Sequence, residues 1–326
     1  MTTIAPPGPI DDRARGLLGG GLALRRRVAD ALVTGGCVAA LLVAAVPLLH
    51  LVVTVASRGA GAITPAWFTR SIQGNVGQLA SQGKINDAFA GGAGTLAQGD
   101  IVLGMQPAIV GTLVITGLAS LLAIPLGVLG AVYLNEYGRR SRPASALRFL
   151  TDVMTGVPSV VTGLFIFSVW VVPRGATGLS ALAGALALAC LMLPIVVRST
   201  EEMLKLVPDN LREASAALGT RTWRTTVGVV IPAALPGITS GAMLAVARAA
   251  GETAPLLFTI GAVTRTNWGI DGVTTALPMQ IYANATENTP EQALMAWGAA
   301  LTLIVIVVVC TVLARVVTSR FSFRPT

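Results

Sequence analysis

The sequence is poor in charge and in the residues that usually form catalytic sites. Charged residues make up 12% of the 326, and the chain has one histidine and three cysteines. It contains no G-x-x-x-x-G-K-[ST] phosphate loop, no H-E-x-x-H zinc motif and no G-x-S-x-G nucleophile motif. These absences exclude an ATPase and the common hydrolases, so any energy source must lie on another chain.

The few potential metal or redox residues are scattered. Cys37, Cys190 and Cys310 lie in three separate apolar stretches without metal-ligand spacing, and we interpret them as packing residues that form no disulfide. We therefore predict no metal and no cofactor bound by this chain. A membrane-embedded lipid-modifying enzyme would need a cluster of His, Asp or Glu at one interface, and the single His50 and dispersed acids argue against that alternative.

Apolar residues dominate instead. Hydrophobic residues make up 53% of the chain and the mean hydropathy is +0.73, values typical of an integral membrane protein. A bilayer core of about 30 Å needs roughly 20 apolar residues as a helix. Six stretches are long enough: approximately Val28–Val55, Ala108–Tyr133, Phe149–Trp170, Leu179–Val197, Leu235–Ile260 and Ala293–Val317. We predict an all-α protein with a six-helix transmembrane domain at 28–317, between short tails at 1–27 and 318–326.

The distribution of Lys and Arg predicts the orientation, because cytoplasmic loops carry the excess of these residues. With the N-terminus inside, most of them face the cytoplasm: Arg13, Arg15, Arg25, Arg26, Arg27, Arg139, Arg140, Arg142, Arg148, Arg198, Lys205, Arg212, Arg221, Arg224, Arg315, Arg320 and Arg324. Both termini and the loop 198–234 are then cytoplasmic, and 56–107 is a long periplasmic segment. A cleaved signal peptide is the competing reading of the N-terminus, but the apolar run of about 28 residues is too long for one.

The net charge of +8 and the isoelectric point of 10.4 follow from this topology. The excess cations suit anionic lipid headgroups, so we expect membrane lipids as partners and no nucleic acid.

A polar segment interrupts the apolar runs between the fourth and fifth stretches. Pro208 precedes two capping residues, Asp209 and Asn210, and Gly219 is a plausible stop, which together predict a helix over Leu211–Leu218. A helix of about two turns is unstable alone and must pack on something. On the residues alone, the segment is either a surface offered to a water-soluble partner or a polar loop lying on the bilayer.

This segment resembles the EAA loop of permease subunits of binding-protein-dependent ABC importers, whose pattern is Glu-Ala-Ala, three residues, Gly, nine residues and Ile-x-Leu-Pro. Here the matching residues are Glu213-Ala214-Ser215, Gly219 and Val229-x-Ile231-Pro232, with mild departures at Ser215, Val229 and Ile231. The resemblance implies a coupling helix that contacts a separate ATPase subunit, which holds ATP and Mg. It assigns this contact to Glu213, Ala214, Ser215, Leu218 and Gly219.

A narrower resemblance is to the phosphate-specific permeases of the PstA type. It rests on six strings: Gly156–Phe165, Gly219–Thr226, Ile231–Gly241, Arg248–Phe258, Leu277–Tyr282 and Ala296–Ala300. The resemblance implies a subunit that forms half of a phosphate pathway in a bacterial cytoplasmic membrane. Its implied partners are a homologous PstC-type permease, two PstB-type ATP-binding subunits and a PstS-type phosphate-binding protein. A related permease for molybdate or sulfate remains an alternative, and a channel would not require the coupling segment.

Two pairs of charged residues are candidates for the substrate pathway. If the fifth helix begins near Gly237, Arg248 lies about 17 Å along it, near the middle of the bilayer, and Glu252 follows at i+4. Arg198 and Glu201 form an i, i+3 pair at the cytoplasmic end of the fourth stretch. A guanidinium suits phosphate oxygens, and Glu252 or Glu201 could hold Arg248 when phosphate is absent. The alternative is an internal ion pair that only fixes helix packing.

Overall fold

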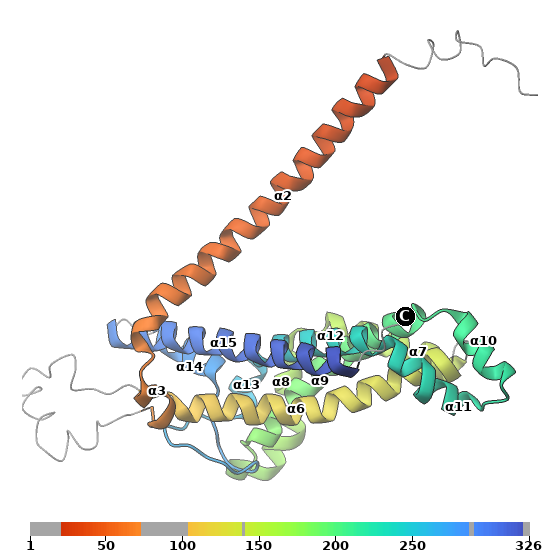
Figure 1. The fold of residues 1–326 in the computed structure, drawn as a ribbon. Helices are drawn as coiled ribbons and strands as arrows, with labels where there is room; N and C mark the ends of the chain where they lie inside the picture. Colours follow the sequence, from red (N-terminus) through yellow and green to blue (C-terminus); the bar gives the residue numbers. More distant parts are fainter. Residues whose placement is uncertain (1–20, 73–103, 139–140, 287–289, 322–326) are drawn as a thin grey trace, which may run out of the picture. The chain divides into compact units, whose positions relative to one another are not determined.

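The computed structural model describes residues 21–72, 104–138, 141–286 and 290–321, and these contain helices and irregular segments but no β-strand. The outermost parts of both predicted tails, and residues 73–103 of the predicted periplasmic segment, lie outside this range. Figure 1 shows the helices along the chain. Among the described residues, five helices are long and apolar enough to cross a membrane, and a bent pair supplies a sixth span. The prediction of an all-α membrane protein is confirmed.

The chain forms two units, residues 1–56 and 57–326. The first contains most of α2 (Gly21–Gly59), a single helix of 39 residues that includes the predicted span Val28–Val55. The remaining helices are η1 (Ala60–Ala62), α3 (Pro65–Thr69), α6 (Gln106–Val132), η2 (Tyr133–Tyr137), α7 (Arg142–Gly156), α8 (Ser159–Ile166), η3 (Phe167–Val171), η4 (Val172–Thr177), α9 (Ala181–Lys205), α10 (Asp209–Ala217), α11 (Thr222–Thr225), η5 (Thr226–Val230), α12 (Ile231–Ala250), α13 (Ala254–Thr259), α14 (Leu277–Ala285) and α15 (Pro290–Phe321).

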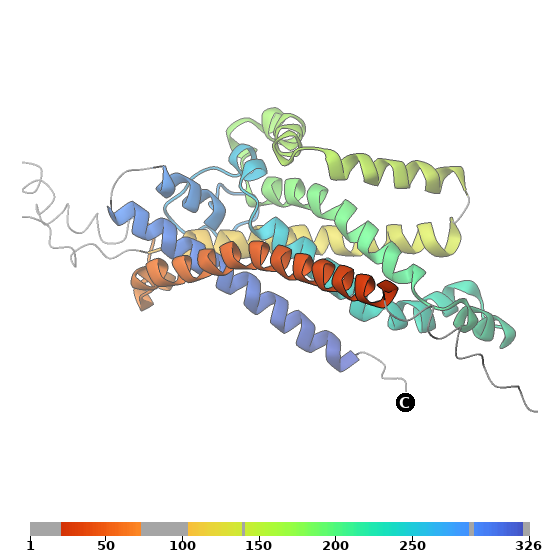
Figure 2. The same ribbon diagram turned by 90° about the horizontal axis from the view of Figure 1, so that it is seen from above.

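The core of the second unit is built by α6, α9 and α12, and Figure 2 shows α9 running beside α6. Its buried side chains are alanines interspersed with larger apolar residues: Ile115, Ala119 and Ala123 of α6, Leu188, Met192 and Val196 of α9, and Ala245 and Ala249 of α12. Small residues let membrane helices approach closely, which replaces the hydrophobic driving force that lipid does not provide. At Gly127 a Cβ atom would lie 2.7 Å from a methyl carbon of Val196, so only glycine fits there.

The predicted third span is not a single straight helix. α7 ends at Gly156 and α8 starts at Ser159, and the two parts of the span are bent by 105°. Pro158 is the cause, because a proline excludes the α-helical conformation from the residue before it, and Val157 is extended with ψ 128°. The expectation of a helix over Phe149–Trp170 is therefore corrected to a helix–break–helix.

The predicted fifth span, Leu235–Ile260, is also interrupted. α12 begins at Ile231 and ends at Ala250, and α13 starts only at Ala254, with Pro255 in its first turn. α13 packs on α8 so closely that a Cβ atom on Gly163 would lie 2.5 Å from the Cα of Pro255. Breaks at membrane depth are tolerated where the backbone is buried in protein or lines a cavity. Both breaks therefore mark the region in which a pathway is to be sought.

The polar segment forms the short helix α10, which begins two residues before the predicted range Leu211–Leu218 and ends one residue before its end, and the predicted cap is wrong. The N-cap is Pro208, whose side chain has no acceptor for the backbone amides of the first turn, and the Asp209 carboxylate accepts a hydrogen bond from Arg212 at 3.0 Å. The predicted stop is confirmed: Gly219 has φ +73°, a left-handed conformation that favours glycine after a helix.

Candidate functional site

Arg248 lies in the last turn of α12, not in the middle of a longer helix. Its Nε is 3.6 Å from Oε1 of Glu252, which follows the helix end, and its side chain is 67% exposed while that of Glu252 is 21% exposed. The structure thus brings this predicted pair together. The long distance and the exposure of the guanidinium leave most of its donors available to another partner.

Arg248 lines a cavity of about 170 Å³ beside the α7–α8 break. The other lining residues come from the α7–α8 break and from α9: Met154, Thr155, Val157, Pro158, Ser159, Leu191, Pro194 and Ile195. Leu191 and Ile195 are about 15 to 21 Å from both ends of α9 at 1.5 Å per residue. The guanidinium is therefore level with the middle of α9, a membrane-spanning helix. It lies at this depth because α12 ends there.

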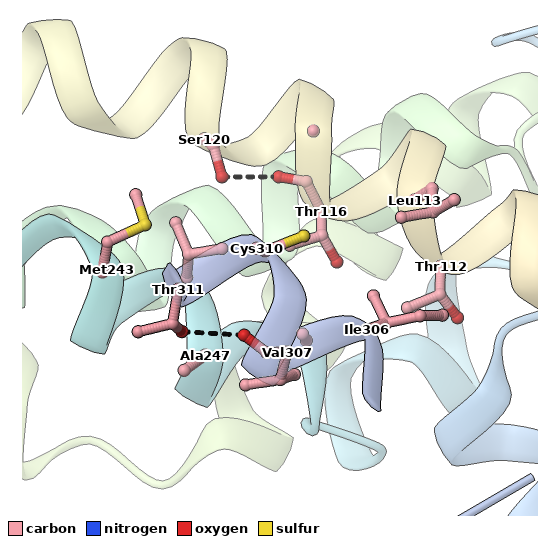
Figure 3. Close-up of a pocket in the computed structure, with 13 residues that line it drawn as sticks. Thr112, Leu113, Thr116, Ser120, Met243, Ala247, Ile306, Val307, Cys310 and Thr311 are labelled. Atoms are coloured by element: carbon pink, nitrogen blue, oxygen red, sulfur yellow. Dashed lines mark hydrogen bonds between the residues drawn. The ribbon is translucent and has the colours of Figure 1, made fainter. Parts of the chain in front are cut away.

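A second cavity is larger but does not suit an anion. Its volume is about 240 Å³. Figure 3 shows its lining residues on α6, α12 and α15. Three of its hydroxyl groups already donate within their own helices: Thr112 to the Ala108 carbonyl at 2.8 Å, Ser120 to the Thr116 carbonyl at 2.7 Å and Thr311 to the Val307 carbonyl at 2.7 Å. The cavity beside Arg248 is smaller and has a charged donor, and we take it as the candidate site.

Arg198 and Glu201 do not pair with each other. Arg198 forms an ion pair with Asp152 of α7. Glu201 is 1% exposed and accepts hydrogen bonds at Oε1 from Arg148 of α7 at 2.8 Å and from Lys205 at 2.9 Å. The reason is packing: α7 lies along α9 and offers closer partners than the next turn of α9 does. Neither residue forms an ion pair with Arg248 in the described part of the chain.

The Glu201 carboxylate is the most buried charge of this region. Its Oε2 has no hydrogen-bond partner among the described residues, so its desolvation is offset only through Oε1. Arg148 also donates to the Leu134 carbonyl at 2.8 Å, beyond the end of α6. Arg148 therefore connects α7, α9 and the segment that follows α6.

The residues assigned to ATPase contact divide between two sides of α10. Glu213, Ala214 and Leu218 are exposed, and Leu218 is 84% exposed. Ser215 is buried, and its hydroxyl lies 2.6 Å from that of Thr220 and 2.8 Å from that of Thr225. Ser215 thus joins α10 to α11, which explains a hydroxyl where the motif has alanine.

Sequence reasoning missed four residues that organise this region: Arg148, Lys205, Glu136 and Arg212. Lys205 could have been found, because it stands at i+4 from Glu201. The Arg148–Glu201 and Arg212–Glu136 contacts bridge 53 and 76 residues, and no local pattern predicts such pairing.

Comparisons with known proteins agree along most of the chain. Residues 123–323 match the family model described as binding-protein-dependent transport system inner membrane component. The chain is 43% identical over 298 residues to the phosphate transport system permease protein PstA 1 of Mycobacterium tuberculosis, covering 91% of this chain and 90% of that protein. It is 44% identical over 289 residues to PstA of Mycobacterium leprae, covering 88% and 87%. It is 44% identical over 207 residues to PstA of Haemophilus influenzae, covering 64% and 72%.

Proposed function

Since this chain belongs to the family of binding-protein-dependent transport system inner membrane components, we propose that it is the permease subunit of an ATP-driven importer of inorganic phosphate. The substrate is supported by the printed role of its relatives, which are phosphate transport system permease proteins. The chain is a multi-pass transport subunit rather than an enzyme. It supplies half of the translocation pathway.

Permeases of this family work with ATPase subunits, and the finer assembly belongs to the proposal. We expect a homologous PstC-type permease, two PstB-type subunits that hold ATP and Mg, and a PstS-type protein that delivers phosphate. The complex sits in a bacterial cytoplasmic membrane with both termini of this chain inside. ATP binding and hydrolysis open the pathway alternately to the two sides.

The observation that carries the proposal is Arg248 at the cavity beside the α7–α8 break. An arginine at mid-bilayer costs at least about 2.5 kcal/mol, so it persists where it faces water, a counter-charge or a substrate. Its planar fork can donate two hydrogen bonds to phosphate oxygens and offset part of the lost hydration. Glu252 holds the guanidinium when the cavity is empty and keeps phosphate from binding too tightly to leave.

Arg198 and Glu201 act on the inner side of this cavity. Arg198 and Glu201 follow Ile195 on α9 by three and six residues, or about 4 and 9 Å towards the helix end. Their ion pairs with Asp152 and Arg148 both hold α7 against α9. We assign them to gating, in which this seam between α7 and α9 closes the pathway below the cavity.

The exposed side of α10 is the surface offered to the ATPase. Leu211, Ala214 and Leu218 are spaced by three and four residues and are all exposed, so they form an apolar stripe along one side of the helix. Glu213 is exposed on another side of α10, and Gly219 follows the helix end. An apolar stripe on a polar segment outside the spans fits a cleft on a water-soluble subunit.

The test is ATP-driven uptake of labelled phosphate by proteoliposomes that hold the complete complex. Arg248→Gln should abolish uptake at equal assembly, and Arg248→Lys should retain part of it, because the charge remains while the fork is lost. Arg265→Gln, at an exposed arginine away from the cavity, is the matched control. Full uptake by Arg248→Gln would leave Arg248 with a packing role only.

A further inference from the structure

We propose that Arg212 is the positioning residue that locks α10 to the ends of α6 and α9, so that these elements move together during transport. The inference rests on the proposed function, because it takes α10 as the helix that the ATPase moves. The side chain of Arg212 transmits that movement, and it lies away from the exposed stripe of α10.

Arg212 makes five hydrogen bonds, as many as a guanidinium has N–H groups. Two go to the Glu136 carboxylate, at 3.0 Å to Oε1 and 3.3 Å to Oε2. Two go to the carbonyls of Leu204, at 2.9 Å, and Val207, at 2.7 Å, at the end of α9. The fifth goes to Asp209. One side chain therefore ties α10 to two other elements and donates to carbonyls at the end of α9, where fewer backbone amides are available as donors.

Glu136 is well placed as the fixed end of this link. It lies in η2, directly after α6, and its side chain is 6% exposed, while that of Arg212 is 15% exposed. The Asn135 amide donates to the same carboxylate at 2.7 Å. A bidentate pair shielded from water is much less screened than one at the surface and holds a defined geometry. The pair is therefore a stiff connection between α6 and α10.

The link continues to the candidate site through rigid elements. α6 and α9 pack along their lengths, and α9 carries Leu191, Pro194 and Ile195 at the cavity beside Arg248. Packed side chains, hydrogen-bond networks and rigid helices are the elements that carry coupling between distant sites. Movement of α10 is thereby passed to the end of α9 through Arg212, and from there to the cavity wall.

The second attachment of α10 runs in another direction. Ser215 joins it to Thr225 of α11, which leads through η5 into α12. Losing Arg212 therefore leaves α10 attached to the chain that leads to Arg248 but removes its side-chain links to η2 and to the end of α9, to which residues 206–208 still connect it. An Arg212 variant therefore loses the link but keeps the ATPase-binding surface, so the effect of the link on coupling can be tested separately from ATPase binding.

The experiment uses the complete complex and compares four variants: Arg212→Gln, Arg212→Lys, Glu136→Gln and the exchange Arg212→Glu/Glu136→Arg. Arg221→Gln, at an exposed arginine, is the matched control. Three quantities are measured: ATPase subunits retained on purification, ATP hydrolysed, and labelled phosphate taken up. Arg212→Gln and Glu136→Gln should keep the ATPase subunits and hydrolyse ATP, with phosphate moved per ATP lowered on the order of tenfold. Arg212→Lys should fall between, and the exchange should recover part of the loss.

An unchanged ratio of phosphate to ATP in Arg212→Gln overturns the inference. So does loss of the ATPase subunits in all four variants, because Arg212 would then serve folding or docking only. Failure of the proposed function looks different: the wild-type complex and Arg221→Gln would then take up no phosphate.

Discussion

Replacing Arg148 by Met leaves Glu201 with one partner in a site where its carboxylate is 1% exposed. Lys205 still reaches Oε1 at 2.9 Å, but Oε2 has no partner among the described residues, and the Leu134 carbonyl loses its donor. Loss of one charged hydrogen bond costs about 1.5–3 kcal/mol, and breaking a buried ion pair costs about 3–5 kcal/mol. With Lys205 remaining, we expect Arg148→Met to lower the free energy of unfolding by about 2–4 kcal/mol.

The ion pair one turn away provides the control. Arg198 and Asp152 are 39% and 47% exposed, and pairs of this kind contribute about 0–1 kcal/mol. Denaturant unfolding of the purified chain in lipid nanodiscs should therefore show a large loss for Arg148→Met and a small one for Arg198→Met. In Arg148→Met/Glu201→Met the loss should shrink, because no buried carboxylate is left unpaired. Equal losses for the two arginines, or additive losses in the double variant, would refute this reasoning.

Three further predictions concern the helices around the site. Leu218→Glu, at an 84% exposed position, should weaken retention of the ATPase subunits at least several-fold in pull-down while leaving the thermal stability of the permease unchanged. Gly219→Val places a β-branched residue at φ +73° and should destabilise the end of α10 by about 1–2 kcal/mol, seen as faster amide exchange in α10; unchanged exchange would contradict it. Gly163→Leu drives a side chain into the backbone of Pro255, so it should separate α8 from α13 and abolish phosphate uptake. Gly156→Ala is the control, because a Cβ atom there meets nothing within 4 Å, and it should retain uptake.

Much of the fold could be predicted from apolar length alone, but the breaks could not be read from it. Hydropathy averaged over about 20 residues does not distinguish a straight span from two short helices meeting at an angle, so Phe149–Trp170 and Leu235–Ile260 were each expected as one span. Pro158 carried the signal for the first break, because it fixes Val157 in an extended conformation. For the second, Gly251 and Pro255 carried weaker signals, and α13 is held by its tertiary contact with Gly163.

The candidate site was predictable where its partners are neighbours on one helix. Arg248 and Glu252 meet as their spacing indicates, and α10 ends at Gly219 as glycine chemistry indicates. Arg198 and Glu201 have suitable spacing too, yet each finds a partner on α7, because tertiary packing offers a better geometry than an i, i+3 pair. The roles of these residues in transport stay predictions.

The most direct measurement of the central claim is uptake by the wild-type complex, reconstituted with its ATPase subunits and phosphate-binding protein. We predict ATP-dependent accumulation of labelled phosphate that unlabelled phosphate competes away and that sulfate and molybdate leave unchanged. Accumulation blocked by sulfate or molybdate, or phosphate movement that continues without ATP hydrolysis, would contradict an ATP-driven phosphate importer.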